Sequence, residues 1–329
     1  MIYRKLGLTG LEVSEIGFGA WGIGGTANGA MSYGPTDDQE SRNALDRAFD
    51  LGVTYFDTSD LYGYGHSERL LGQVFRAKRE KVVIGSKVGF LGKNGDQDFS
   101  AKHIRNSIEK SLQRLGTDYL DLYQLHDPPI ELLATNDEII PTLESLQAAG
   151  KIRTYGISVR HSEDALTAVK EFGFPVVQVN LNLVDQRIVE NGFLGLCGKE
   201  SIGLIARTPL CFGFLTGSYT PTSQFDPLDH RNRWPRSQIG IWSEANQLFL
   251  NKGNVTGDFG TFAQRALRYC LSYPSVSTTI PGMLSVKEVE ENVEASSLGP
   301  LSTEERIEIE KVYKKKSFFL GKAAMGPNA

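Results

Sequence analysis

The chain has 329 residues, of which 40% are hydrophobic and 22% are charged, with a formal net charge of −4. A chain of this length buries roughly three quarters of its unfolded surface, and it lies in the size range of a single α/β barrel. The slightly acidic balance argues against a nucleic-acid partner, because nucleic-acid-binding domains usually present a basic stripe. The basic run Lys314-Lys315-Lys316 is typical of a solvated helix end.

Three cysteines, Cys197, Cys211 and Cys270, are widely spaced in apolar surroundings. This pattern predicts reduced, buried thiols rather than a disulfide framework or a metal site. The N-terminal residues 1–5 lack the long apolar stretch of a signal peptide, and no apolar run approaches the length that spans a bilayer. We therefore expect a cytoplasmic protein without a membrane partner.

Strand-like and helix-like patterns alternate along the chain, after an N-terminal segment whose alternation around Gly7 and Gly10 predicts a β-hairpin. Short apolar runs predict eight strands, at Glu15–Phe18, Val53–Asp57, Val82–Lys87, Tyr119–Leu125, Thr154–Ser158, Val176–Asn180, Gly203–Arg207 and Ser277–Ile280. Helical periodicity predicts helices at Gln39–Leu51, Ser67–Phe75, Ala101–Leu115, Asp137–Ala148, Ser162–Glu171, Ile188–Gly198, Thr261–Tyr273 and Val286–Ala295. A capping box predicts a further exterior helix at Ser302–Lys315, and the tail Ala323–Ala329 is expected to fray.

The helical predictions depend on periodicity and on capping residues. Ile104, Ile108 and Leu112 recur at helical spacing after Ser100, an N-cap residue, and Gly116 follows as a stop signal. Eight βα units without a linker predict one domain over residues 1–329. Its expected fold class is α/β, a (β/α)8 TIM barrel with an N-terminal β-hairpin and an extra C-terminal helix. An open doubly wound sheet is the structural alternative.

Two long segments interrupt the alternation. The glycine-rich segment Gly19–Thr36 follows the first strand, and we expect it to form a flexible loop over the barrel mouth. The segment Ser218–Trp242 lies between the seventh strand and its helix and is rich in proline and arginine. Loops of this length are usually functional or disordered, and the aromatic and arginine content favours a function.

Four residues that can carry a proton or tune a pKa end a predicted strand or follow it closely: Asp57, Tyr62, Lys87 and His126. Active sites of α/β barrels are built at this edge. Each residue also has an ordinary explanation: a loop tyrosine, a structural ion pair between Asp57 and Lys87, or a histidine that caps a turn. Because all four positions coincide with strand ends, the catalytic interpretation is favoured.

The sequence resembles the aldo-keto reductase family over nearly its whole length. The most specific matching segments are Phe56–Gly63 (FDTSDLYG), Gly65–Gly72 (GHSERLLG), Ser86–Gly89 (SKVG) and Leu125–His126. The resemblance implies an NAD(P)(H)-dependent oxidoreductase that interconverts a carbonyl (an aldehyde, a ketone or a sugar) and its alcohol by hydride transfer. It also implies that the catalytic tetrad is Asp57, Tyr62, Lys87 and His126.

This tetrad makes chemical sense, because carbonyl reduction needs a proton on the developing alkoxide. Tyr62 would be the general acid and base, but a free tyrosine has a pKa of about 10. The ammonium of Lys87 is expected to lower that pKa, and Asp57 would hold Lys87. His126 would orient the carbonyl and stabilise developing charge. Nothing in this scheme needs a metal.

The resemblance implies NADP(H) or NAD(H) as the cofactor. Ser158 and Gln178 match residues that grip the nicotinamide carboxamide, whereas Val159 replaces the usual Asn. Arg207 occupies the position of an aromatic ring that stacks on nicotinamide, so a guanidinium plane is expected to cover the ring instead. Further contacts implied by the resemblance are Gly19, Ala20, Trp21, Thr208, Leu210, Gly213, Leu215 and Gly217.

The adenosine end of the cofactor is expected to contact Ile280, Gly282, Lys287, Glu288, Glu291 and Asn292. Many family members carry an Arg at the position of Leu284 or Glu288, where it binds the 2′-phosphate. A carboxylate repels that phosphate and suits the free ribose hydroxyls of NAD, although Lys287 and the helix N-terminus could still bind phosphate. The family default is NADPH, and our hypothesis is that NADH is used as well or preferred.

A small-molecule substrate is expected to contact Trp21, Phe90, Asp127 and the segment Ser218–Trp242. The arginines of that segment, together with Asp60, hint at a hydroxylated or anionic substrate such as a sugar. One rival is a nicotinamide-binding regulatory scaffold with slow turnover, like the family members that regulate potassium channels. A metal-dependent barrel hydrolase is a second rival, disfavoured because no paired His motif lies at the strand ends. The sequence leaves the oligomeric state open.

Overall fold

The computed structural model describes residues 1–92, 94–249 and 260–321, so the tail Ala323–Ala329 lies outside the described residues. Its centre is an eight-stranded sheet in which each strand pairs in parallel with the next one along the chain. The strands are β3 (Phe18–Gly19), β4 (Tyr55–Asp57), β5 (Val83–Val88), β6 (Leu120–His126), β7 (Ile152–Ser158), β8 (Val176–Asn180), β9 (Gly203–Arg207) and β10 (Val276–Thr279). Parallel bridges from Ile16 to Thr279 and from Gly19 to Gly282 join the first and last strands. The predicted barrel is therefore confirmed, and the open-sheet alternative is wrong.

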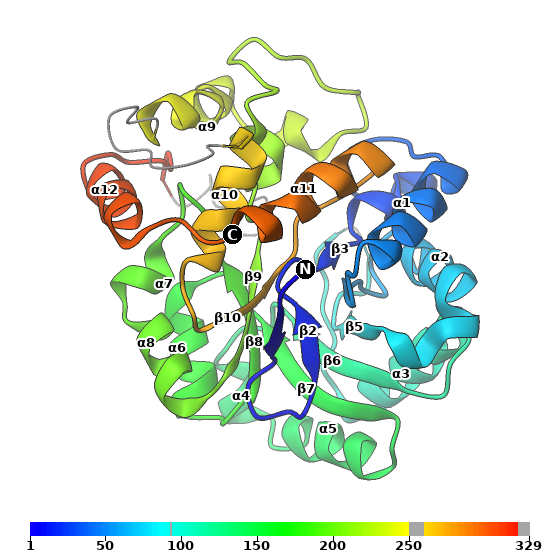
Figure 1. Cartoon of the computed structure of the whole chain (residues 1–329). Helices are drawn as coiled ribbons and strands as arrows, with labels where there is room; N and C mark the ends of the chain where they lie inside the picture. Colours follow the sequence, from blue (N-terminus) through cyan, green and yellow to red (C-terminus); the bar gives the residue numbers. More distant parts are fainter. Residues whose placement is uncertain (93, 250–259, 322–329) are drawn as a thin grey trace.

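Helices surround the strands (Figure 1). The α-helices are α1 (Asp38–Asp50), α2 (His66–Phe75), α3 (Ala101–Leu115), α4 (Leu132–Thr135), α5 (Ile139–Ala148), α6 (Ser162–Lys170), α7 (Arg187–Glu190), α8 (Phe193–Glu200), α9 (Arg236–Phe249), α10 (Phe262–Leu271), α11 (Val286–Leu298) and α12 (Thr303–Lys314). Short 3-10 helices are η1 (Gly22–Gly24), η2 (Ala27–Gly29), η3 (Arg76–Lys81), η4 (Cys211–Thr216) and η5 (His230–Arg233). In the described part of the chain, no helix is long and apolar enough to cross a bilayer.

The N-terminal hairpin closes one end of the barrel. Its strands β1 (Tyr3–Lys5) and β2 (Glu12–Ser14) pair antiparallel, as predicted, and lie across the middle of the barrel in Figure 1. Leu6 and Val13 are fully buried among interior residues at the starts of the strands. Gly7 has a φ of 57°, and a Cβ there would meet the backbone N of Gly203 at 2.4 Å. Because this end is sealed by the hairpin, the functional site is left to the opposite end, where the strands terminate.

Local capping explains why several helix boundaries agree with the sequence predictions. The α3 helix spans the predicted residues because the Ser100 side chain accepts a hydrogen bond from the His103 N–H and Gly116 takes a left-handed conformation after the last turn. The α12 helix begins at a capping box between Ser302 and Glu305. The three cysteines are free and buried, as predicted.

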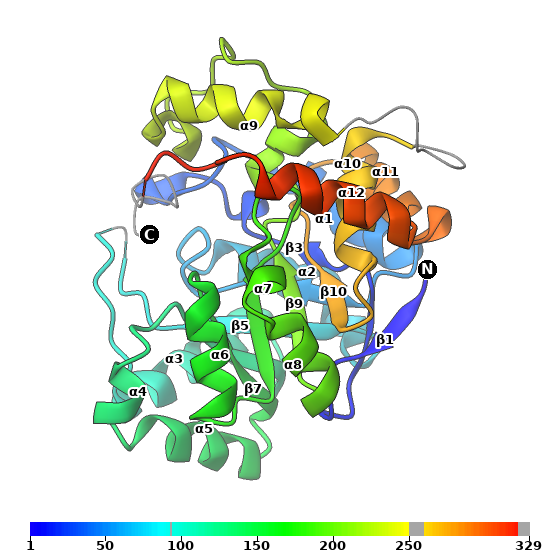
Figure 2. The same cartoon turned by 90° about the vertical axis from the view of Figure 1, so that its left-hand side faces the viewer.

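Many predicted boundaries differ from the observed ones by one to three residues, and the structure explains four of the differences. The first strand covers Phe18–Gly19, because residues 15–17 meet the last strand only through isolated backbone hydrogen bonds. The predicted helix Asp137–Ala148 begins at Ile139 as α5, after the separate short helix α4. The predicted helix Ile188–Gly198 is divided into α7 and α8, because Gly192 has a φ of 81°. The predicted loop Ser218–Trp242 becomes helical at Arg236, where α9 begins and packs against η4 and α12 (Figure 2).

Candidate active site

The four predicted catalytic residues meet at the open end of the barrel. Asp57 and His126 are the last residues of β4 and β6, Lys87 lies near the end of β5, and Tyr62 belongs to the loop that precedes α2. The Lys87 Nζ atom lies 2.5 Å from Asp57 Oδ2 and donates to Tyr62 Oη at 3.2 Å. The ring centroids of Tyr62 and His126 are 6.0 Å apart. The structure therefore brings the predicted tetrad together.

Lys87 is a buried ammonium whose charge is balanced by its neighbours. Its side chain is 0% exposed, and burial acts to lower its pKa, but Asp57 and Tyr62 raise the pKa above its ordinary value. Asp57 in turn accepts hydrogen bonds at Oδ1 from Gln178 at 2.7 Å and from Tyr55 at 3.2 Å. A buried ion pair is stable only when its remaining polar atoms are also bonded. This network therefore fixes a positive charge beside the Tyr62 hydroxyl.

The expected pKa of Tyr62 is wrong in its net direction. Burial raises the pKa of the Tyr62 phenol, the charge of Lys87 acts to lower it, and the charge of Asp57 raises it further. Burial outweighs Lys87 because a tyrosinate loses much of its hydration in this setting. The phenol is therefore protonated at neutral pH, which suits a group that donates a proton to a carbonyl oxygen.

His126 is neutral at neutral pH. Burial holds the pKa of the imidazole well below its ordinary range, and the charge of Lys87 lowers it further. Its Nδ1 lies 3.2 Å from Ser59 Oγ, and Ser59 also lies 3.2 Å from Asp60 Oδ1. Phe90 meets the imidazole edge-on with 4.9 Å between ring centroids. The ring is thus held in place, and its Nε2 can be a hydrogen-bond donor when Ser59 donates to Nδ1.

The wall beyond the tetrad is a hydrogen-bonded group centred on Arg207. Its Nη1 donates to Ser158 Oγ at 2.9 Å, and its Nε donates to Asn180 Oδ1 at 2.9 Å. Gln178 accepts a hydrogen bond from Ser158 at 3.3 Å. Val159 is buried in the core. The polar function expected of an Asn after Ser158 is therefore absent from that position.

Asn180 was missed by the sequence analysis. It ends β8 two residues after Gln178, so both side chains lie on the same face of the strand. Asn180 lines the cavity, and its Oδ1 accepts hydrogen bonds from Arg207 and from Thr208. The two-residue repeat of a β-strand could have identified Asn180, because it places the side chain on the same face of the strand as the predicted Gln178.

The segment after β9 turns sharply along the cavity. Thr208, Cys211 and Phe212 have φ values of 51°, 45° and 56°, and Gly213 has a φ of 90°. Left-handed conformations in residues other than Gly are uncommon and often mark functional sites. Leu215 is fully buried, and a Cβ on Gly217 would meet Phe262 at 2.6 Å. Neither of these two predicted cofactor contacts lines the cavity: Leu215 is buried, and Gly217 is exposed outside it.

One cavity of about 630 Å³ connects the tetrad with the start of α11. The predicted site residues that line it are Gly19, Trp21, Asp57, Tyr62, His126, Gln178, Arg207, Thr208, Leu210, Gly213, Ile280, Gly282, Lys287, Glu288, Glu291 and Asn292. Those that do not line it are Ala20, Lys87, Ser158, Leu215 and Gly217. Gly19 lines the cavity beside the tetrad, and only glycine fits there, because a Cβ would meet the Ile280 carbonyl oxygen at 2.8 Å. Its extent from the tetrad to α11, its amide groups and the glycines in its wall suit a dinucleotide.

The far end of the cavity contains a capped helix start with a carboxylate. Ser285 caps α11 by accepting a hydrogen bond from the Glu288 N–H at 3.3 Å, and Glu288 Oε2 accepts from the Leu284 N–H at 2.6 Å. Lys287 lies beside them on the cavity wall. The helix N-terminus thus carries both a positive and a negative side chain.

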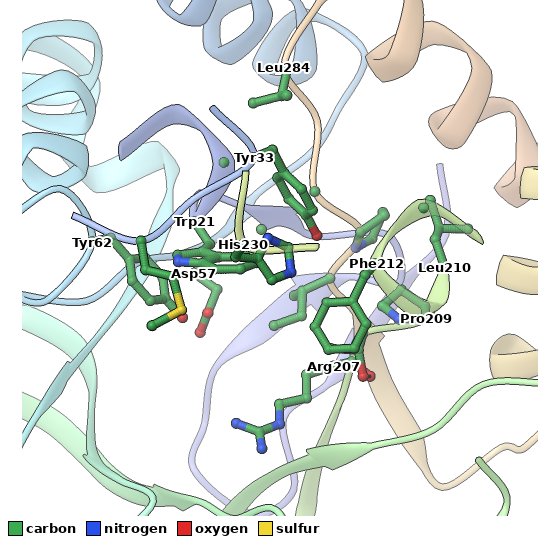
Figure 3. A pocket seen from close by; sticks show the side chains of 18 of the residues that line it. Trp21, Tyr33, Asp57, Tyr62, Arg207, Pro209, Leu210, Phe212, His230 and Leu284 are labelled. Atoms are coloured by element: carbon green, nitrogen blue, oxygen red, sulfur yellow. Dashed lines mark hydrogen bonds between the residues drawn. The ribbon is translucent and has the colours of Figure 1, made fainter. Parts of the chain in front are cut away.

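Aromatic residues from the two long segments form the roof of the cavity. Trp21, Tyr33 and His230 pack edge-on with centroid distances of 4.6 to 5.0 Å (Figure 3). The backbone N–H of His230 donates to Ser32 O at 3.0 Å, which joins the two segments. Arg231 is held by Asp229 at 2.6 Å and lies over the ring of Tyr33. Arg231, the arginine of the segment Ser218–Trp242 that lines the cavity, is therefore already paired with Asp229. This pairing disfavours the prediction that it binds an anionic substrate.

Comparisons with known proteins match the chain to one family over most of its length. The family model described as "Aldo/keto reductase family" matches residues 15–314. A Bacillus subtilis protein named "Uncharacterized oxidoreductase YqkF" is 31% identical over 309 residues, which cover 92% of this chain and 93% of the relative. A Schizosaccharomyces pombe aldo-keto reductase, yakc, with NADP(+) in its name, is 30% identical and covers 88% of this chain and 85% of its own. The holo form of aldo-keto reductase AKR11C1 from Bacillus halodurans superposes with a TM-score of 0.78 at 29% identity, covering 96% of this chain and 97% of its own.

Proposed function

The chain belongs to the aldo/keto reductase family and is an oxidoreductase, and we propose that it interconverts a carbonyl compound and its alcohol by nicotinamide-dependent hydride transfer. The observation that carries this proposal is the buried Lys87 Nζ, which lies 2.5 Å from Asp57 Oδ2 and 3.2 Å from Tyr62 Oη. The cavity of about 630 Å³ that extends to the start of α11 reaches the same tyrosine. The substrate carbonyl lies between Tyr62 and His126.

Tyr62 donates its proton to the carbonyl oxygen during reduction and takes it back during alcohol oxidation. A nicotinamide nucleotide, when bound, supplies or accepts the hydride at the carbonyl carbon. The charge of Lys87 stabilises the tyrosinate that remains after proton donation, which offsets part of the cost of burying it. Asp57 keeps Lys87 charged and in place. General acid catalysis of this kind contributes roughly 10²- to 10⁴-fold to the rate.

His126 positions the carbonyl as a neutral hydrogen-bond donor. The Ser59 hydroxyl has one proton, which it can donate either to His126 Nδ1 or to Asp60. When it is donated to Nδ1, the proton of the imidazole is on Nε2 and faces the developing oxyanion. Ser59 is therefore a positioning residue that acts through the tautomer of His126.

We further propose that NADH is used at least as well as NADPH. The Glu288 carboxylate lies at the start of α11, where a 2′-phosphate would need a cation, and it accepts from the Leu284 N–H. A carboxylate at that place repels a phosphate and accepts a hydrogen bond from a ribose hydroxyl. The fission-yeast relative with NADP(+) in its name supports the opposite preference for that protein. Lys287 on the same turn leaves NADPH binding feasible.

Steady-state oxidation of NADH and NADPH with a panel of aldehydes, ketones and sugars tests the proposed function. We expect turnover that falls by roughly 10²- to 10⁴-fold in Tyr62→Phe. Tyr3→Phe is the matched control. Tyr3 belongs to the hairpin at the sealed end of the barrel, and its hydroxyl donates a hydrogen bond to Gly52 O, far from the tetrad. Tight nucleotide binding without turnover would favour the regulatory scaffold, and full activity in Tyr62→Phe would contradict the assigned role.

A further inference from the structure

A second charged cluster lies beside the tetrad, at the ends of β6, β7 and β9. Asp127 follows His126 directly and has a φ of 53°. Its Oδ2 accepts a hydrogen bond from Arg160 Nε at 2.7 Å, and its Oδ1 lies 3.3 Å from Arg207 Nη1. Gln97 donates to the backbone oxygens of Asp127 and His126 at 2.9 and 3.0 Å. The single carboxylate of Asp127 thus pairs with two guanidinium groups, those of Arg160 and Arg207.

This arrangement leaves an excess of positive charge. Within the described part of the chain, Asp127 is the only carboxylate within ion-pair distance of Arg160 or Arg207. The Lys87–Asp57 pair is neutral as a unit, so the cluster adds about one net positive charge next to the carbonyl position. The charges of the cluster act on the neighbouring imidazole in both directions: after burial, Asp127 raises the pKa of His126, and Lys87, Arg207 and Arg160 lower it.

Arg160 also has hydrogen-bonding capacity to spare. Its Nε donates to Asp127, and among residues 1–92, 94–249 and 260–321 no acceptor is bonded to its two terminal nitrogens. The side chain is 24% exposed and lines the cavity. Its guanidinium carbon lies 6.0 Å from the ring centroid of Phe90, and that ring packs on His126. Unlike Arg231, which is enclosed by Asp229 and aromatic rings, Arg160 can therefore bind a ligand.

We propose that Arg160, with Asp127 and Arg207, forms an anion subsite that binds a carboxylate or phosphate group on the carbonyl substrate. The forked N–H groups of a guanidinium match both anions in a bidentate geometry, and a partly buried cleft strengthens the attraction. The inference rests on the proposed function, because it places the anion a short distance from the carbonyl held by Tyr62 and His126. The substrate class is an aldehyde or ketone with an anionic group, rather than a neutral sugar.

Matched substrate pairs test this subsite. We would measure kcat/KM for butanal against succinic semialdehyde and for glyceraldehyde against glyceraldehyde 3-phosphate, which separates carboxylate from phosphate. The wild type should prefer the anionic member of at least one pair by tenfold or more. Arg160→Met should lose about tenfold or more on the anionic member and less than threefold on the neutral member, and Arg160→Lys should retain part of the preference. Arg105→Met is the control, because Arg105 is exposed on α3, bonds to Ser145 and does not line the cavity.

An equal rate for both members of each pair, or an equal loss for both in Arg160→Met, would overturn the subsite while leaving the proposed function intact. Absence of turnover with every carbonyl would instead mean that the proposed function fails. The subsite then remains testable by fluorescence titration with succinate and with inorganic phosphate. Weaker binding to Arg160→Met than to wild type supports the subsite, and equal binding contradicts it.

Discussion

The two sides of the barrel mouth are held together in different ways. On the side of β4 to β6, the buried ammonium of Lys87 bonds to both Asp57 and Tyr62, and Asp57 also accepts a hydrogen bond from Gln178 of β8. On the side of β7 to β9, Arg207 is held by Ser158 and Asn180, which are contributed by neighbouring strands. A network of buried charges tolerates little substitution, because removal of one charge leaves its partner buried and unpaired, whereas a wall of neutral hydrogen-bonding partners can exchange one residue type for another. Two of the residues that depart from the family pattern, Val159 and Arg207, belong to the side of β7 to β9.

The strongest test of the side of β4 to β6 is Lys87→Met. Removal of the ammonium leaves the Asp57 carboxylate buried without its cation, which costs about 3–5 kcal/mol of unfolding free energy. Urea denaturation measures this loss, and activity should fall with it. The double variant Lys87→Met/Asp57→Asn should recover much of the stability and none of the activity. Equal stability of the single and double variants would show that the pair is not the source of the loss.

Arg207→Met tests the wall. The substitution removes hydrogen bonds to Ser158 and Asn180 and leaves Asp127 with Arg160 alone. We expect nucleotide affinity to fall by roughly tenfold, because one or two charge-assisted hydrogen bonds that shape the site are lost. The dissociation constant can be measured by nucleotide fluorescence, and Arg207→Lys is the companion variant that keeps the charge. An unchanged dissociation constant in Arg207→Met would mean that Arg207 has no part in the nicotinamide wall.

The nucleotide preference is expected to respond to Glu288. In the wild type, the Michaelis constant for NADH should be no larger than that for NADPH, and Glu288→Arg should shift the ratio toward NADPH by about tenfold, because a guanidinium replaces a repelling carboxylate. Glu294→Arg, an exposed position on the same helix that does not line the cavity, is the control. A hundredfold preference of the wild type for NADPH would contradict the hypothesis.

A smaller effect is expected from Asp60, at the boundary of the tetrad. Burial, and to a smaller extent the charge of Glu68, raises the pKa of this carboxyl to about 7, against the lowering effects of Arg114 and the hydrogen bond from Ser59. Since the folded state favours the protonated form, ionisation destabilises the fold progressively as pH rises from about 4 to about 7. Asp60→Asn should therefore stabilise the protein by about 1 kcal/mol at pH 8, a value reduced because residual solvent contact screens part of the shift. The stabilisation should be smaller at pH 5, where the carboxyl of the folded protein is mostly protonated. Urea unfolding at both pH values checks this, with Asp46→Asn as an exposed control. An identical effect at both pH values would argue against a buried carboxylate.

Much of the fold could be predicted because its signals are local. The caps of α3 and α12 follow from a few neighbouring residues, and the strand ends that carry Asp57 and His126 follow from short apolar runs. The failures have local and distant causes. Gly192 was not recognised as a helix break, and the short first strand depends on hydrogen bonds to Thr279, which is far away along the chain.

The site could be predicted where its residues form motifs and not where they act through distant contacts. His230 and Ser32 are 198 positions apart, so their contact, which joins the two segments of the roof, has no signature in the periodicity. Arg160 was missed because its importance depends on sharing Asp127 with Arg207. The net pKa of Tyr62 also could not be predicted, because it depends on how burial compares with the charge of Lys87. The single domain, the cytoplasmic location and the oligomeric state stay untested predictions or open questions.

Transfer of deuterium tests the central claim most directly. With a carbonyl substrate found in the screen and reduced nucleotide deuterated at the transferable C4 position, the account predicts one deuterium on the carbinol carbon of each product molecule. Tyr62→Phe should bind the same nucleotide with an unchanged dissociation constant and form product at least a hundred times more slowly. Unlabelled product from the wild type, or a Tyr62→Phe variant that forms labelled product at the wild-type rate, would contradict it.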